Sequence, residues 1–109
     1  MANNFVQEGK VLHYIPQEGE EIKSGDLVAV NDVAGIAITD GVPGYKLAVS
    51  VDGVYAVPVP ASVGNISQGR KVYYDTDAKE ISLDDENLFI GWAWEDGAPG
   101  ESVPIKLAF

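Results

Sequence analysis

Apolar and polar residues alternate along most of the chain in short runs, which are separated by turn-forming residues. This two-residue period is typical of strands with one buried face, and no window keeps a helical period of 3.6 residues over three turns. The pattern predicts a nearly all-β protein of about nine short strands. They are expected at residues 10–15, 27–30, 33–39, 45–51, 54–59, 71–75, 79–83, 88–94 and 101–107. Such a set hides its apolar faces in a small sandwich or in a partly closed barrel, and the pattern does not choose between them.

The turn residues between these strands carry further predictions. Asn31-Asp32 returns the chain between two strands, and Asp52-Gly53 is a strong signal for a two-residue hairpin of type I′. Pro58 and Pro60 lack backbone donors, so the strand before them is expected to lie at a sheet edge or to stop early.

A short segment of the chain is repeated 56 residues further on. Both copies predict a strand, a turn and a strand, because Gly, Pro and Asp suit turn geometry and alternating apolar residues follow. Neither copy contains a nucleophile, a base or a metal ligand in a catalytic pattern. The repeat therefore favours a scaffold or binding module over an enzyme. The identical residues are Gly35, Ala37, Asp40, Gly41, Pro43 and Gly44, which recur as Gly91, Ala93, Asp96, Gly97, Pro99 and Gly100.

Length and composition exclude several classes of protein. A chain of 109 residues predicts a single domain, residues 1–109, with a short extended N-terminal arm at residues 1–9. The absence of cysteine excludes disulfides and thiolate metal sites, and the single histidine, His13, excludes most zinc sites. The formal charge of −10 disfavours partners with phosphate backbones and anionic membranes, so we expect neither nucleic acid nor membrane as a partner. No secretion signal is recognisable, which predicts synthesis in the cytoplasm.

The candidate chemical residues are better explained as structural ones. Asp84-Asp85-Glu86 does not have the spacing of an EF-hand loop and is typical of a solvated turn. His13 lies between Leu12 and Tyr14 on an expected strand. We therefore predict no catalytic residue, no metal site and no cofactor.

Trp92 and Trp94 are two residues apart on one strand, so their rings are expected on the same face, with Tyr73 or Tyr74 near them. The same positions in the first copy of the repeat are aliphatic, which favours the core or an oligomer interface for both tryptophans. A sugar-stacking platform, as in a carbohydrate-binding β module, is the alternative. A second alternative is a hammerhead domain, since residues 18–28 are similar to the turns of lipoyl and biotinyl carriers. Lys79 is then the only remote candidate for the modified lysine.

Taken together, several short motifs resemble a family of tailed-phage and prophage capsid cement proteins, also called head-decoration proteins. The motifs run nearly from end to end of the chain, in order. One departure is Arg70 after Gly69, where this family often has Gly-Asp. The motifs are at residues 4–9, 24–28, 34–37, 52–55, 69–75 and 90–93, followed by the alternating strand that ends at Leu107.

The resemblance implies a non-enzymatic virion protein that binds the outer surface of an icosahedral head and bridges its capsid subunits. Its partners would be the major capsid protein and further copies of itself, as a homotrimer or alternatively a dimer. An acidic protein without a basic patch suits the outer face of a DNA-filled shell. We predict that the uncharged arm attaches it to the capsid, by adding a strand to a capsid edge. The predicted attachment residues are Ala2, Asn3, Asn4, Phe5, Val6 and Gln7.

Overall fold

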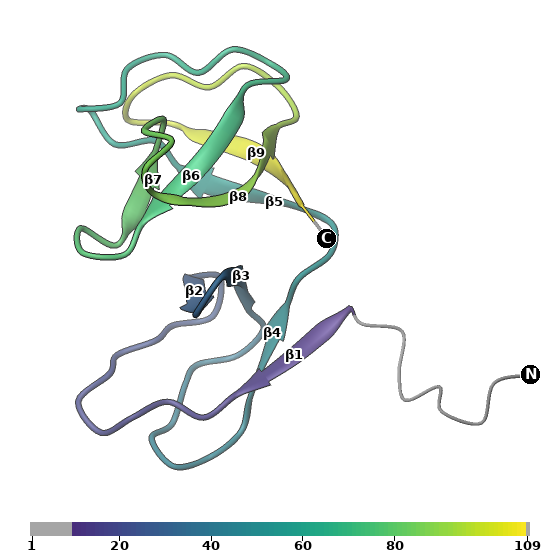
Figure 1. Cartoon of the computed structure of the whole chain (residues 1–109), viewed down its shortest axis with the longest axis vertical. Coiled ribbons are helices and arrows are strands. Elements are labelled where there is room, and N and C mark those ends of the chain that lie inside the picture. Colours follow the sequence, from purple (N-terminus) through teal and green to yellow (C-terminus); the bar gives the residue numbers. More distant parts are fainter. Residues whose placement is uncertain (1–9, 109) are drawn as a thin grey trace, which may run out of the picture.

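The structure is a computed structural model that describes residues 10–108. This part of the chain contains nine strands and no helix, which confirms the all-β prediction. The strands form two antiparallel sheets, ordered β1-β4-β3-β2 and β5-β9-β8-β6-β7, and neither is closed into a barrel (Figure 1). The fold is therefore a small sandwich. The strands are β1 (Val11–Tyr14), β2 (Leu27–Val30), β3 (Val33–Ala37), β4 (Leu47–Ser50), β5 (Val54–Pro58), β6 (Lys71–Asp75), β7 (Glu80–Ser82), β8 (Leu88–Ala93) and β9 (Ser102–Leu107).

The two sheets are built in the same way, so the repeat is larger than the short segment seen in the sequence. In the first sheet β4 lies between β1 and β3, and β2 follows at the edge; in the second, β9 lies between β5 and β8, and β6 follows. The strand registers also correspond. Ile36 is opposite Ser50 and, 56 residues on, Trp92 is opposite Lys106. The chain thus consists of a first unit, residues 10–51, and a second unit, residues 53–107.

Hydrogen bonds outside the strands repeat in the same places. The backbone N–H of Ser24 donates to the Asp40 carboxylate at 2.9 Å, and the N–H of Gln68 donates to Asp96 at 2.7 Å. Ala37 and Ala93 each donate to a carbonyl at 2.9 Å, of Asp26 and Arg70 respectively. These bonds use backbone groups and one aspartate, so they persist where most side chains differ between the units.

The second unit has additional residues between β6 and β8, which form the turn before β7 and β7 itself. The register equates Leu27 with Lys71, 44 positions on, whereas Ile36 is equated with Trp92, 56 positions on. This insertion explains why β2 and β6 are not recognised as copies when a single separation is used.

The repeated glycines lie where two backbones come close together. A Cβ at Gly35 would collide with the backbone oxygen of Ser50, and a Cβ at Gly91 would collide with that of Lys106. Because Ser50 and Lys106 are themselves equivalent, both units require glycine at this position for the same steric reason.

Each unit has its own buried core, and the two cores use equivalent positions. Val28, Ala37, Leu47 and Val49 form the first, and their equivalents in the second unit belong to a larger cluster. Those equivalents are Val72, Ala93, Val103 and Ile105.

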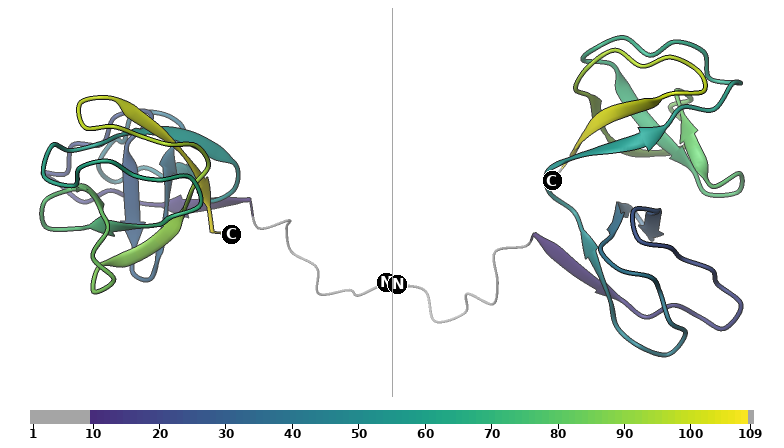
Figure 2. Two further views of the ribbon diagram at one scale, coloured as in Figure 1. Left: turned by 90° about the horizontal axis from the view of Figure 1, so that it is seen from above. Right: turned by 180° about the vertical axis from the view of Figure 1, so that it is seen from behind.

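The units also pack on each other. Ala34 and Ile36 of β3 are buried in the cluster of the second unit, with Leu27 and Ala29 of β2 packed against it. β3 also lies close to β8. In Figures 1 and 2 the first unit lies against one end of the second, and the chain passes between them once, from β4 to β5.

The predicted hairpin at Asp52-Gly53 is wrong. β4 pairs with β1 and β3, whereas β5 pairs with β9, so these two residues link the sheets. Gly53 has a φ of 104°, but Asp52 is not among the residues with positive φ, which a type I′ turn would require. The hairpin at Asn31-Asp32 is confirmed, since Val30 pairs with Val33 and Asn31 has a φ of 55°.

The proline prediction is confirmed. β5 is the edge strand of the second sheet and ends at Pro58.

Candidate attachment and assembly surfaces

The predicted attachment residues, Ala2 to Gln7, lie outside the described residues. The chain that follows them begins at β1, an edge strand of the first sheet that pairs only with β4.

Three aromatic rings lie together on the outer side of the second sheet. The centroids of Tyr73 and Phe89 are 5.7 Å apart, and those of Phe89 and Trp92 are 5.2 Å apart. The ammonium group of Lys71 lies 5.9 Å from the centre of the Phe89 ring, within the range of a cation–π contact. We call Lys71, Tyr73, Phe89 and Trp92 the aromatic face. Lys71 is exposed and the three rings are half-buried.

A β-bulge brings Phe89 onto this face. The register between β6 and β8 shifts between Val72 and Tyr73, so Tyr73 pairs with Phe89 while Val72 pairs with Gly91. Ile90, the residue left unpaired by the shift, is completely buried. A bulge re-aims side chains in this way. The sequence pointed to Trp92 and Tyr73, but nothing in the alternation indicated that Phe89 would join them.

Neither tryptophan belongs to the buried core. Trp92 is half-buried, and Trp94, just beyond the end of β8, is 53% exposed. Of the two predicted roles, the oligomer interface therefore stays a prediction. The rings do not form a flat stacking platform for a sugar, because Phe89 is inclined at 79° to Trp92 and at 59° to Tyr73.

The equivalent surface of the first unit is covered. Leu27 corresponds to Lys71, Ala29 to Tyr73 and Ile36 to Trp92, and these three first-unit residues pack against the second unit. One repeated surface is thus used within the chain, and its copy faces outward.

A second exposed apolar group lies in the loops of the first unit, and the sequence analysis did not single it out. Tyr45, expected at the start of a strand, is 71% exposed and precedes β4. The other large exposed apolar residues of this unit are Ile15, Ile38 and Val42.

A groove of about 420 Å³ runs along the contact between the units. One side is formed by β2 and the chain before it, including Asp26 and Leu27; the other includes Val57, Tyr74 and Lys79. Burial, and then the negative charges of Asp26 and Asp75, raise the pKa of Tyr74 above its usual value.

The clearest electrostatic pair near this groove is Tyr14 with Glu20. The Tyr14 hydroxyl donates to Glu20 Oε1 at 2.6 Å, and the backbone N–H of Gln17 donates to the same oxygen at 2.7 Å. This hydrogen bond to Glu20, with burial and the nearby charge, raises the pKa of Tyr14 to about 12. The bonds from Tyr14 and Gln17 lower the pKa of Glu20.

We expect Tyr14→Phe to lower the free energy of unfolding at neutral pH by about 1 kcal/mol, because a hydrogen bond to a partly exposed carboxylate is lost. A lowered folded-state pKa stabilises the fold above the ordinary value, here 4.5, so this contribution should vanish as pH falls through the lowered pKa of Glu20. A raised pKa acts in the other direction, so the contribution should also be lost as pH rises from 10.0 towards about 12. Urea unfolding of both proteins across this pH range measures the difference.

Tyr45→Phe is the matched control, since Tyr45 is 71% exposed. It should follow the wild type at every pH. A Tyr14→Phe difference that does not change with pH would show that the hydroxyl and the carboxylate are not coupled.

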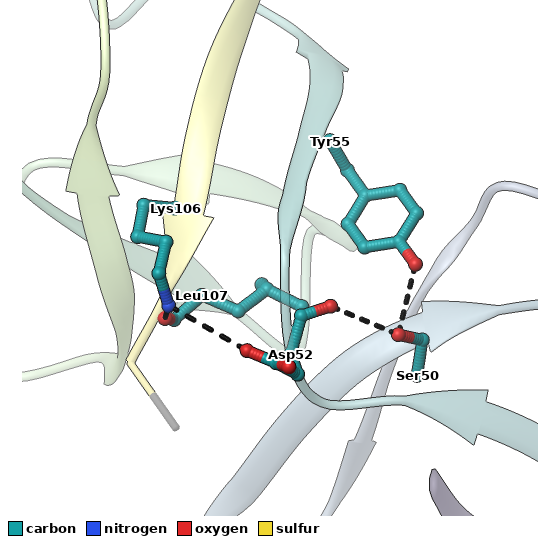
Figure 3. Close-up of polar contacts among 5 residues, drawn as sticks. All are labelled: Ser50, Asp52, Tyr55, Lys106 and Leu107. Carbon is teal, nitrogen blue, oxygen red and sulfur yellow. Dashed lines mark hydrogen bonds and ion pairs between the residues drawn. The ribbon is translucent and has the colours of Figure 1, made fainter. Parts of the chain in front are cut away.

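A small polar network holds the link between the units (Figure 3). The Tyr55 hydroxyl donates to Ser50 Oγ at 2.8 Å, and Ser50 Oγ donates to the carbonyl of Asp52 at 3.0 Å. Lys106 Nζ lies 3.8 Å from Asp52 and donates to the Leu107 carbonyl at 2.8 Å. Ser50 is the only buried polar residue among residues 10–108. The network joins β4, the link, β5 and β9.

The other candidate residues lie in turns or on the surface. His13 is exposed on β1, and the Asp84 carboxylate accepts a bond from the backbone of Glu86 within its turn. Lys79 lies in the β6–β7 turn with a φ of 57° and lines the groove. Over the described part of the chain, no three acidic or histidine side chains are placed to hold a metal ion.

Comparison with known proteins gives one match. A family model described as phage cement protein matches residues 6–107. No curated protein and no solved structure matches the chain significantly. Within residues 10–108 there is no helix long and apolar enough to cross a membrane.

Proposed function

We propose that this chain, which belongs to the phage cement protein family, binds the outer surface of an assembled icosahedral head and stabilises it by bridging capsid subunits. The match to the family model over residues 6–107 carries the proposal, since it covers nearly the whole chain. The role is structural and non-enzymatic. The protein would be made in the cytoplasm of the bacterial host and would end on the capsid.

The charge of the protein supports an outer position. Its formal charge of −10 would repel the packaged genome, whereas nothing opposes its binding to a protein lattice. The partner is accordingly the major capsid protein. A homotrimer fits a local threefold axis best, and a dimer is the alternative.

Attachment is assigned to the arm, Ala2 to Gln7. It has no charged residue and contains Phe5 and Val6 as apolar anchors, and it precedes an edge strand. An uncharged extended segment can pair with an exposed strand of another protein, where backbone bonds give affinity and alternate side chains give specificity.

We expect deletion of residues 2–7 to reduce binding to undecorated heads sharply. A loss of about 1.4 kcal/mol per arm is tenfold per site, and it multiplies when several arms of one oligomer bind together. Co-sedimentation of the purified protein with undecorated heads measures the effect, and light scattering reports the oligomeric state.

Phe5→Ser with Val6→Ser is the companion variant, because it keeps the length of the arm and should show most of the same loss. Asn3→Ser with Asn4→Ser is its control and should bind like the wild type. Full binding by the deletion variant would refute attachment through the arm while leaving the capsid as the partner. Failure of the wild type to bind heads would refute the function itself.

A further inference from the structure

The contact between the two units provides a template for a contact between two copies of the chain. On one side it uses the outer residues of β2 and β3, Leu27, Ala29 and Ile36. On the other side it uses Val57 of β5 and Tyr74 of β6, which belong to the same buried cluster. Both sides line the groove between the units.

Each side of this contact has an equivalent that the chain itself does not cover in the same way. The equivalent of the first side is the aromatic face of the second unit. The register equates Val57 with Tyr14, Pro58 with Ile15 and Tyr74 with Val30. We call Tyr14, Ile15, Val30 and the hydrogen-bonded Glu20 the receiving face. Ile15 is 52% exposed, and Tyr14 and Val30 are half-buried.

The chemistry of the two faces is complementary. The aromatic face carries Lys71 and is next to Arg70, which stands at the position of Asp26 in the first unit. The receiving face carries Glu20, held by Tyr14 at 2.6 Å. On a chain with seven basic and seventeen acidic residues, a basic pair beside three rings is a distinct surface. Aromatic residues and arginine are enriched at the centres of protein interfaces.

We propose that the aromatic face of one copy packs against the receiving face of a second copy, so that molecules associate head to tail and continue the internal repeat. Such a contact is heterologous, since each copy contributes two different faces. It closes into a ring when the rotation between neighbours allows it. The inference rests on the oligomer of the proposed function and names its surfaces.

Two variants, one on each face, test this arrangement by light scattering over a concentration series. Phe89→Ser with Trp92→Ser alters the aromatic face, and Ile15→Asp alters the receiving face. Each should raise the dissociation constant of the oligomer at least tenfold and leave monomers where the wild type is assembled. Lys71→Glu changes an exposed residue and should weaken association even if the double variant folds poorly.

Mixing the two variants distinguishes head-to-tail contacts from other arrangements. Each variant keeps one intact face, so an equimolar mixture should form a dimer of the two and nothing larger. Tyr45→Asp, outside both faces, is the control and should assemble like the wild type.

A monomeric wild type, normal assembly of either variant, or a mixture that stays monomeric would overturn the proposal. Since this experiment uses no heads, such a result leaves capsid attachment untouched. Loss of head binding in the arm variants would likewise say nothing against the contact between the two faces.

Discussion

Replacing Gly91 with alanine is expected to destabilise the protein by about 3 kcal/mol, because overpacking and the loss of strand hydrogen bonds add together. The added Cβ would collide with the backbone oxygen of Lys106, on the strand that pairs with β8. A backbone atom within a sheet cannot move aside as a side chain can. Thermal unfolding should show a decrease in Tm of about 12 °C or more for a chain of this size.

Gly100→Ala is the control for the conformational part of this cost. Gly100 has a φ of 81°, and nothing lies within 4 Å of the position of an added Cβ, so we expect a loss of about 1 kcal/mol from backbone strain alone. Gly35→Ala, whose Cβ would meet the oxygen of Ser50, should be as costly as Gly91→Ala. If Gly91→Ala and Gly100→Ala melted together, the close approach of β8 and β9 would be refuted.

Replacing Ile36 with lysine is expected to cost about 3–5 kcal/mol, because it places an unpaired charge in the contact between the units. Ile36 is 3% exposed and belongs to the cluster that contains the core of the second unit. Urea unfolding measures the loss, at a low protein concentration so that association does not contribute.

The repeat supplies a matched control at the equivalent position. Trp92→Lys introduces the same side chain on the half-buried aromatic face and should cost about 1 kcal/mol, mainly from the lost contact with Phe89. Equal losses at the two positions would mean that the second unit does not cover the first as described.

Much of the fold could be predicted from the sequence, because the period of apolar residues is a local property. The alternation located all nine strands, with ends that differ from the structure by at most two residues. Asn31-Asp32 and Pro58 also acted as their local chemistry predicts, since a two-residue turn and a missing backbone donor do not depend on distant partners.

Asp52-Gly53 shows where local chemistry misleads. The dipeptide permits a hairpin, but strand pairing is selected by the whole sheet. β4 finds β1 and β3, and β5 finds β9, so the turn becomes a link between sheets. The size of the repeat was hidden for a related reason. Backbone bonds such as those of Ala37 and Ala93 preserve the unit without preserving side chains.

The sequence by itself determined the strands, the turns, the acidic surface and the glycines at Gly35 and Gly91, since each depends on neighbours along the chain or on total composition. Only the tertiary structure decided which copy of a repeated surface is covered. Ile36 and Trp92 occupy equivalent positions, and both are apolar, yet the first is buried by the second unit and the second faces outward. Burial depends on what packs above a residue, and in a repeated chain one copy of each contact surface is left at the end without a partner.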